Sequence, residues 1–308
     1  MHGRACAMMS AFPSHERVPV SEAVAVPPRR PEWLKVRLKS ADTISRMKPV
    51  LEGLHTVCES ARCPNIGECW GRGTATFMIL GDVCTRKCTF CAVPQGDAGP
   101  PDPFEPARLG EAVRSLGLAH TVITSVTRDD LADQGATQFR LCIEQVRAKK
   151  PDCTIEVLIP DFQGNWDALN IVMQAGPEVL NHNIETVPRL YKRVRPHAIY
   201  AQSLELLERA RAYGTAKTKS GLMVGLGETF DEVVATMDDL HAHGVQILTI
   251  GQYLKPRDHR IEVDRYVHPD EFAEFKRLAY EKGFEHCESG PLVRSSYHAE
   301  SHIDRPLL

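Results

Sequence analysis

Short apolar runs alternate with amphipathic stretches along most of this chain. The apolar runs have the length and residue content of buried strands, and they lie at residues 76–80, 121–126, 154–159, 179–184, 220–226 and 247–250. Stretches with helical periodicity lie at residues 107–116, 138–149, 166–175, 203–213, 232–243 and 269–282. Strands that alternate with helices predict a parallel α/β sheet covered by helices.

This alternation does not decide how the sheet closes. An open doubly wound sheet and a barrel give the same pattern, and in both the working site lies at the carboxyl ends of the strands. Residues 1–30 are rich in proline and lack periodicity, so we expect a disordered tail there. We expect an N-terminal extension at 31–73, a barrel body at 74–284 and a C-terminal segment at 285–308.

Composition and charge limit the classes of function. Charged residues make up 25% of the 308 residues, and the net charge is −3 with both signs spread along the chain. This balance favours neither a nucleic-acid partner nor a membrane surface. No apolar run is long enough to span a bilayer, and none follows the N-terminus as in a secretory signal. We therefore expect a cytoplasmic protein whose 10 cysteines act as ligands rather than as disulfides.

Six of the cysteines form two groups of three. The first group follows the first predicted strand with the spacing Cys-x₃-Cys-x₂-Cys and contains Cys84, Cys88 and Cys91. The second group precedes that strand with the spacing Cys-x₄-Cys-x₅-Cys and contains Cys58, Cys63 and Cys69. Each group brings three thiolates close enough in sequence to surround one inorganic centre, as in iron–sulfur proteins.

Zinc is the main alternative to iron–sulfur clusters. Structural zinc requires four ligands in a closed tetrahedron, usually from paired Cys-x₂₋₄-Cys units, and two triads match that pattern poorly. His55, shortly before Cys58, is a possible fourth ligand. A chain with two zinc sites of this kind would be a binding protein rather than an enzyme, and spacing alone leaves this alternative open.

A triad of thiolates leaves the fourth iron of a four-iron cluster without a protein ligand. That iron is free to bind a small molecule, to which the cluster can donate an electron. The first triad, with the aromatic Phe90 before its last cysteine, resembles the signature of the radical S-adenosylmethionine superfamily. The resemblance implies a [4Fe-4S] cluster on Cys84, Cys88 and Cys91 that binds S-adenosyl-L-methionine, with Phe90 near the adenine.

The second triad resembles the auxiliary-cluster motif of the lipoyl synthase family. Five further segments agree with that family, at residues 125–131, 181–186, 219–223, 225–229 and 294–297. The resemblance implies a partial (β/α)₆ TIM-like barrel with extensions at both ends. It also implies a sulfurtransferase that inserts two sulfur atoms, at C6 and C8, into an octanoyl group held on a lysine of a carrier protein. Under this resemblance Cys58, Cys63 and Cys69 hold a second [4Fe-4S] cluster, which donates the sulfur and is consumed.

The resemblance also implies further site residues. Ser296, in the Arg-Ser-Ser-Tyr sequence at 294–297, would be the fourth ligand of the second cluster, and its neighbour Ser295 is the alternative. A serine oxygen is a weaker partner for iron than a thiolate, which suits a cluster that must come apart. The candidates for contact with S-adenosyl-L-methionine are Asn183, Glu185, Lys219 and Glu228. Polar residues at strand ends also serve only to satisfy loop backbones, so each candidate has a purely structural alternative.

The partners that the resemblance implies are proteins. They are octanoylated lipoyl carrier domains, in 2-oxoacid dehydrogenase E2 subunits and the glycine cleavage H protein, and an electron donor such as flavodoxin or ferredoxin. A basic stretch forms either a docking patch for an acidic carrier or an ordinary solvated face, and it contains Arg189, Lys192, Arg193 and Arg195. A different radical enzyme, such as a biotin-type or transfer-RNA sulfur inserter, remains a rival, although the balanced charge disfavours RNA.

Overall fold

The computed structural model describes residues 30–35, 47–60, 63–256 and 260–303. A sheet of eight strands lies at its centre, in the order β1 to β8. The strands are β1 (His55–Thr56), β2 (Thr74–Ile79), β3 (His120–Ser125), β4 (Thr154–Leu158), β5 (Val179–Asn181), β6 (Lys217–Val224), β7 (Ile247–Gln252) and β8 (His286–Gly290). Each neighbouring pair from β2 to β8 is parallel, whereas β1 pairs with β2 antiparallel. The predicted tail, with Cys6, lies outside the described residues except for Arg30.

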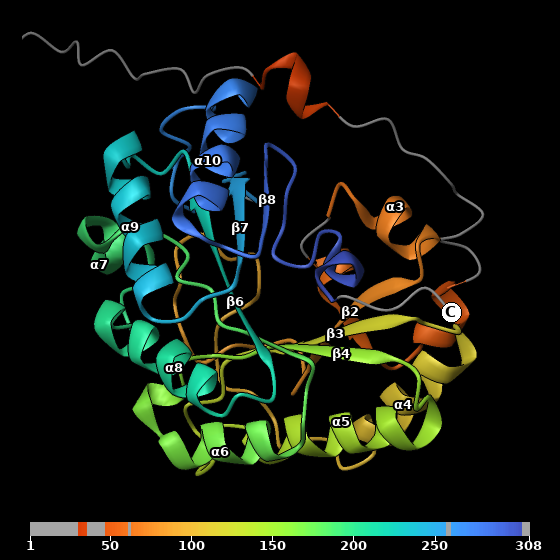
Figure 1. Ribbon diagram of the computed structural model, residues 1–308. Coiled ribbons are helices and arrows are strands. Elements are labelled where there is room, and N and C mark those ends of the chain that lie inside the picture. The colour runs from red at the N-terminus through yellow and green to blue at the C-terminus, as the bar shows by residue number, and fades with distance from the viewer. Residues whose placement is uncertain (1–29, 36–46, 61–62, 257–259, 304–308) are drawn as a thin grey trace, which may run out of the picture.

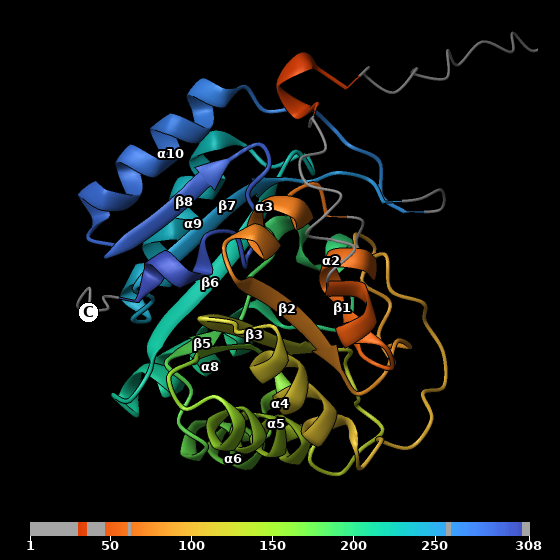
Figure 2. The ribbon, with the colours of Figure 1, turned by 90° about the vertical axis from the view of Figure 1, so that its right-hand side faces the viewer.

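Helices surround the outer face of this sheet (Figures 1 and 2). The α-helices are α2 (Val57–Ser60), α3 (Ile66–Gly71), α4 (Glu105–Ser115), α5 (Ala136–Lys149), α6 (Trp166–Gln174), α7 (Tyr191–Val194), α8 (Tyr200–Ala212), α9 (Phe230–Ala242) and α10 (Pro269–Lys282). The short 3₁₀ helices are η1 (Glu32–Leu34), η2 (Lys48–Leu51), η3 (Phe162–Gly164), η4 (Pro188–Leu190) and η5 (Ala299–His302). Among the described strands β8 pairs with neither β1 nor β2, so the barrel is partial. The predicted fold class is confirmed.

The predicted strands correspond to β2 through β7, and the predicted helices to α4, α5, α6, α8, α9 and α10. Strand β5 ends at Asn181, earlier than predicted. Beyond it the regular pairing with β6 is interrupted at Ile184, whose N–H donates to Ser220 Oγ at 3.1 Å, and it returns at Glu185, whose N–H donates to the Gly221 carbonyl at 2.9 Å. Strand β8 lies beyond residue 284, where the sequence predicts the barrel body to end. Its residues are mostly polar, and they carry no apolar run that would predict a strand.

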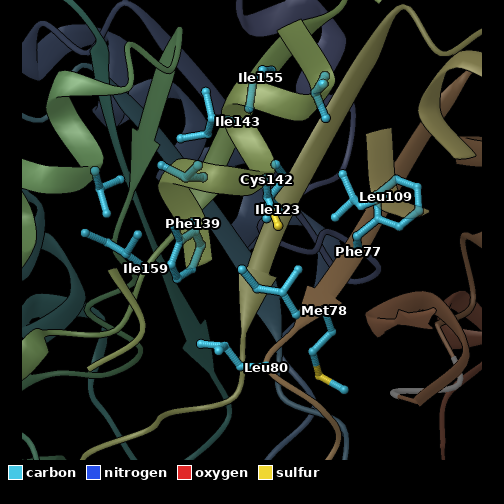
Figure 3. Packing of buried hydrophobic residues seen from close by; sticks show 14 of the residues in the cluster. Phe77, Met78, Leu80, Leu109, Ile123, Phe139, Cys142, Ile143, Ile155 and Ile159 are labelled. Carbon is cyan, nitrogen blue, oxygen red and sulfur yellow. The ribbon is translucent and has the colours of Figure 1, made fainter. Parts of the chain in front are cut away.

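The hydrophobic core has two parts. The first packs β2, β3 and β4 against α4 and α5, and Figure 3 shows Phe77, Ile123 and Ile155 of the strands with Leu109 and Phe139 of the helices. Each of these side chains is at most 1% exposed, and burial of one such side chain stabilises the fold by about 1.5–3 kcal/mol. The second part packs β6 and β7 against α9 and α10. The two halves of the barrel therefore have separate cores on the outer face of a common sheet.

The unpaired cysteines take part in these cores. Cys142 of α5 and Cys153, just before β4, are 0% and 1% exposed, which confirms their predicted burial. Cys287 of β8 is also buried, in the second core. Burial raises the pKa of the Cys287 thiol to about 12, as expected for a cysteine that serves packing rather than reactivity.

The inner face of the barrel holds a buried polar network. Side chains alternate along a strand, so β4 directs Ile155 and Val157 to the outer core and Glu156 inward. Both Glu156 carboxylate oxygens lie 2.9 Å from Lys219 Nζ on β6, and Asn181 Nδ2 on β5 donates to Glu156 Oε1 at 3.0 Å. An unpaired buried charge costs several kcal/mol. A shift of β4, β5 or β6 that separated these side chains would incur that cost, so the contacts hold the three strands in one register.

Candidate active site

A cavity of about 1040 Å³ opens at the carboxyl ends of the parallel strands. Its wall includes residues at the ends of four strands, Ser125, Leu158, Met223 and Gln252. The first triad lines the same cavity with Cys84, Cys88 and Cys91. Val57 and Pro64 also line the cavity, and they are the sequence neighbours of Cys58 and Cys63 in the second triad. The cavity is therefore lined by the first cysteine group itself and by sequence neighbours of the second group, at the predicted side of the sheet.

The loop of the first triad is fixed by backbone hydrogen bonds. The Cys84 N–H donates to the Pro94 carbonyl at 2.9 Å, which folds the loop back on itself. The Thr89 N–H donates to the Val194 carbonyl at 3.1 Å, and the Thr89 carbonyl accepts from Ile261 at 3.3 Å. The three thiols are thus held by segments that follow β2, β5 and β7.

Arg86 anchors this loop to the segments that follow β3 and β4. Its guanidinium donates to both carboxylate oxygens of Asp129 at 2.7 and 2.8 Å and to Asp161 Oδ1 at 2.6 Å. Burial alone would raise the pKa of Asp161, but the hydrogen bond and charge of Arg86 hold it below its ordinary value. The sequence did not single out Arg86, although an arginine between two cysteines near an Asp-rich segment was a usable signal.

Arg86→Ala should destabilise the apoprotein strongly. Asp161 is 0% exposed in its side chain, so loss of the arginine leaves an unpaired buried charge, which costs about 3–5 kcal/mol of unfolding free energy. Urea unfolding followed by circular dichroism measures this loss. The matched control is Arg114→Ala, whose pair with Glu111 lies at the surface and whose unfolding midpoint should not move. An unchanged midpoint for Arg86→Ala would contradict the anchoring role.

The thiols of the first triad suit a metal better than a nucleophilic role. Burial raises the pKa of Cys88 to about 11, while the nearby Arg195 opposes that rise. Burial also raises the pKa of Cys91, and both thiols interact electrostatically with Cys84. A nucleophilic cysteine needs a lowered pKa, whereas a metal displaces the proton on binding. Three half-buried thiols on one short loop therefore fit a [4Fe-4S] cluster.

The second triad is similarly gathered. Cys58 lies in α2 and Cys69 in α3, and the Cys63 N–H between these helices donates to the Cys58 carbonyl at 2.9 Å. Burial raises the pKa of Cys58 to about 11 and that of Cys69 to about 12, and the neighbouring thiols of the triad add to both shifts. The three thiols therefore face one another closely enough to interact, as ligands of one cluster must.

The predicted serine ligands lie beside this second triad. Asn65 Nδ2 donates to the Leu292 carbonyl at 2.7 Å, and the Tyr297 hydroxyl donates to Glu68 Oε1 at 3.3 Å. The stretch with the two serines therefore lies against α3, which carries Cys69. Ser295 lines the cavity, and Ser296 is half-buried. The structure thus brings the C-terminal segment to the second triad, and it leaves both serines as candidate ligands.

Three of the predicted cofactor contacts lie on the cavity wall. Phe90, Asn183 and Glu185 all line it. Asn183 Nδ2 donates to Glu185 Oε1 at 3.2 Å, and Asn183 Oδ1 is buried without a hydrogen-bond partner among the described residues. A Cβ added at Gly221 would lie 3.0 Å from that oxygen and would overlap Thr249 Oγ1. An unsatisfied acceptor beside a glycine fits a ligand that brings hydrogen-bond donors, such as the ammonium group of S-adenosyl-L-methionine.

The other two predicted contacts, Lys219 and Glu228, are not among the residues that line the cavity, and their contact with S-adenosyl-L-methionine stays a prediction. Lys219 points into the barrel and pairs with Glu156. Glu228 accepts hydrogen bonds from the Gly225 and Leu226 N–H groups at 2.5 and 2.9 Å. Gly225 has a φ of +94°, so Glu228 holds a turn that only glycine adopts without strain. Glu228 therefore supports the backbone, whereas Lys219 pairs with another buried side chain.

The predicted basic stretch is only partly a surface. Arg195 is buried, and its Nη1 donates to the Asn183 carbonyl at 2.9 Å. Arg189 pairs with Glu232 of α9 at 2.6 Å. Lys192 and Arg193 remain exposed. Arg195 is therefore not part of any docking patch, and of the three exposed basic side chains Arg189 is already paired with an acidic partner.

The zinc alternative gains no support from the geometry. In the part of the chain that the structure describes, no three His, Cys, Asp or Glu side chains, those of the two triads included, lie at the close spacing that a single metal ion requires. The proposed fourth ligand His55 is exposed on β1, whereas Cys58 is 8% exposed.

Known proteins resemble the chain both in sequence and in fold. Residues 78–240 match the Radical SAM superfamily. The chain is 56% identical to a lipoyl synthase of Roseiflexus sp. over 281 residues, which cover 90% of this chain and 93% of that protein. It is 55% identical to a lipoyl synthase of Halalkalibacterium halodurans, with 90% and 92% covered. The chain belongs to the lipoyl synthase family. The family assignment sets aside the biotin-type and transfer-RNA alternatives.

Solved structures support the fold. Methylornithine synthase (PylB) superposes with a TM-score of 0.54 at 12% identity, covering 77% of this chain and 73% of its own. SuiB of Streptococcus suis, bound to S-adenosylmethionine, superposes with a TM-score of 0.54 at 11% identity, covering 79% and 57%. At these identities the likeness concerns the barrel alone.

The family membership confirms the predicted enzyme class and cofactors. The chain is a sulfurtransferase that inserts sulfur into a protein-bound octanoyl group, and its cofactors are S-adenosyl-L-methionine and [4Fe-4S] clusters. None of the helices in the described ranges is long and apolar enough to cross a membrane.

Proposed function

We propose a division of labour between the two cysteine groups. Cys84, Cys88 and Cys91 hold the cluster that receives S-adenosyl-L-methionine. The second cluster, which supplies sulfur, is held by Cys58, Cys63, Cys69 and Ser296. When bound, these groups supply the hydrogen-atom abstraction and the sulfur that the unactivated C6 and C8 require. The observation that carries this proposal is a single cavity that is lined by the first triad and also by Val57 and Pro64, the neighbours of Cys58 and Cys63, since one octanoyl chain must meet both clusters.

The chain's own residues position the substrate in this proposal. Leu34, Val57 and Leu292 line the cavity near the second triad and offer an apolar wall for the octanoyl chain. Leu158 and Leu222 line it on the side of the strands. These side chains also keep water away from the reacting carbons. Residues 31–73 and 285–308 serve as the extensions that bring the second cluster to the barrel body at 74–284.

The test is an anaerobic assay of the reconstituted protein. An octanoyl-lysine peptide, S-adenosyl-L-methionine and a chemical reductant are supplied, and mass spectrometry follows the peptide. The proposal expects a gain of two sulfur atoms per peptide, with no gain when S-adenosyl-L-methionine is omitted. Cleavage of S-adenosyl-L-methionine without any gain of sulfur would overturn it.

We also propose that Phe90, Asn183 and Glu185 contact S-adenosyl-L-methionine. Burial raises the pKa of Glu185, whereas Arg195 and Asn183 oppose that rise by stabilising the carboxylate. A cationic ligand bound beside Glu185 would stabilise the carboxylate further. A hydrogen bond to a charged group is worth about 1.5–3 kcal/mol, so Asn183→Ala should weaken binding about ten- to a hundredfold. Calorimetric titration measures this change. Asn170→Ala, on α6 and away from the cavity, is the control that should bind normally.

The carriers and the electron donor belong to the same proposal. Lys192 and Arg193 are exposed next to the first triad's loop, because the Arg193 carbonyl accepts from Thr89 Oγ1 at 3.0 Å. We propose that they favour acidic partners, namely the lipoyl domains of 2-oxoacid dehydrogenase E2 subunits, the glycine cleavage H protein, and flavodoxin or ferredoxin. Assays with each octanoylated carrier and each donor rank these partners. Equal rates at low and high salt would argue against a charge-guided interface.

A further inference from the structure

The C-terminal segment at residues 293–303 crosses the gap between β8 and β2 (dark blue in Figures 1 and 2). It begins after β8, passes the helix α3 that carries Cys69, and ends with η5 at the start of β2 and β3. The segment therefore closes the side of the barrel that no strand pairing closes among the described residues. Its contacts fall into two groups, one on each side of the gap.

The first group of contacts joins the segment to α3 and β2. Arg72, which caps the C-terminus of α3, lies 2.9 Å through its Nε from Glu300 Oε1. Glu300 Oε2 accepts from Thr74 Oγ1 at 3.0 Å. His298 Nε2 lies 2.9 Å from Arg72 Nη1 and 3.2 Å from Glu68 Oε1. Glu68 and Arg72 flank Cys69 in sequence, so these contacts bind the segment to the turns around that ligand.

The second group of contacts lies inside the barrel. His302 is 3% exposed, and its Nδ1 lies 3.2 Å from Lys219 Nζ. Lys219 is the residue that pairs with Glu156, so the end of the segment joins the buried network of β4 and β6. The His302 ring also packs against His286 of β8, with ring centroids 4.4 Å apart. His302 therefore fastens the segment to β6 and β8, and the cofactor cavity lies at the opposite, carboxyl ends of the parallel strands.

A third contact holds the segment on the other side of the serines. Asn65 Nδ2, just before α3, donates to the Leu292 carbonyl at 2.7 Å. Ser295 and Ser296 thus lie between one anchor at Leu292 and two anchors at Glu300 and His302. A serine oxygen is a weak ligand for iron, and ordering one residue costs about 1–2 kcal/mol. Ordering all of residues 293–303 costs several times that amount, so the anchors at Leu292, Glu300 and His302 contribute to it together with the ligand bond.

We propose that Glu300 and His302 are positioning residues that hold the Ser295–Ser296 pair against the second cluster. This inference rests on the proposed function, in which one of these serines is the fourth ligand. Neither residue touches iron or substrate in this arrangement. Each acts through the chain, because the anchors keep the serine oxygen in place while the bond to iron forms and after it breaks.

The first test uses the apoprotein and needs no cluster. Glu300→Gln keeps the shape of the side chain and removes its charge, so the segment should open more often. Hydrogen–deuterium exchange of peptides from 293–303 should quicken about tenfold, which corresponds to about 1.4 kcal/mol. The matched control is Glu178→Gln, which weakens a similar half-buried contact with Arg147 elsewhere in the fold. Unchanged exchange in 293–303 for Glu300→Gln would overturn the anchoring role.

The second test asks whether the anchors serve the cluster. In a background with Cys84, Cys88 and Cys91 replaced by alanine, only the second cluster remains. Iron loss to a chelator should be at least about fivefold faster for Glu300→Gln than for Glu178→Gln, whereas in a background that keeps only the first triad the two should match. His302→Ala should show the same selective loss, and His302→Gln, which retains an acceptor for Lys219, should restore much of the retention.

The outcomes separate this inference from the function on which it rests. Faster exchange with unchanged iron retention would overturn the positioning role, since the segment would then be anchored for the fold alone. Faster exchange with selective iron loss supports it, whichever serine is the ligand. A wild-type protein that retained its second cluster but transferred no sulfur would contradict the proposed function. The positioning role of Glu300 and His302 would still stand, because exchange and iron retention measure it without sulfur transfer.

Discussion

Replacing Cys84, Cys88 and Cys91 together with alanine is expected to abolish the cleavage of S-adenosyl-L-methionine. These thiols lie on the cavity wall beside Phe90, Asn183 and Glu185, and no other thiol of the described residues lines that cavity. Without them the open iron that receives the cofactor has no support. Chromatography of the cleavage products measures the loss, and sulfur insertion should disappear with it.

Replacing the other triad should split these two activities. With Cys58, Cys63 and Cys69 changed to alanine, cleavage of S-adenosyl-L-methionine should continue, because the first loop is held by its own contacts with Asp129, Asp161 and Val194. Sulfur insertion should fall to background, since the source of sulfur is gone. Formation of lipoyl product by this variant would show that the sulfur comes from elsewhere.

A buried cysteine outside both triads provides the control for these variants. Cys142→Ala removes a thiol that is 0% exposed in the first core. It should lower the unfolding free energy by about 1 kcal/mol through the loss of packing, and it should leave iron content and both activities unchanged. Loss of iron in this variant would mean that the triple variants act through general instability rather than through ligation.

The strands and helices around the sheet were predictable because each follows a local rule. β2 through β7 are apolar runs, and α10 begins and ends where the sequence predicts, with Pro269 at its start and Gly283 after its end. β8 was missed because its residues are mostly polar and only Cys287 is fully buried, so pairing with β7 and packing against α10 leave no apolar run in the sequence. Tertiary contacts rather than local preference make it a strand.

The residues of the candidate active site were likewise predictable only where local sequence determines their position. Both triads were predictable because one cluster needs its ligands within a short stretch of chain, which fixes the spacing of the cysteines. The role of Lys219 was not, because its partner Glu156 lies 63 residues away and meets it only inside the barrel. A signal existed, since a lone glutamate in the apolar run at 154–159 requires a buried partner. The sequence did not say which cation supplies it.

Ser296→Ala is expected to impair sulfur insertion far more than the cleavage of S-adenosyl-L-methionine. The contacts of Leu292 with Asn65 and of Tyr297 with Glu68 hold the serine pair against α3, which carries Cys69, so loss of the hydroxyl should remove a ligand from the second cluster only. Insertion should fall at least about tenfold, equivalent to 1.4 kcal/mol, while cleavage should stay within about twofold. Single-turnover assays after anaerobic reconstitution, with iron measured for each variant, give both rates.

Ser296→Cys tests the chemistry of the same ligand in the opposite direction. A thiolate binds iron more tightly than a serine oxygen, so this variant should keep its iron and still transfer sulfur slowly, because the iron that must leave is held too well. Ser295→Ala is the matched control, since Ser295 lines the cavity and differs from Ser296 by one position. If only the Ser295 variant lost sulfur transfer, that residue would be the ligand. If both alanine variants and Ser296→Cys turned over normally, the cluster would have to find its fourth ligand outside this pair.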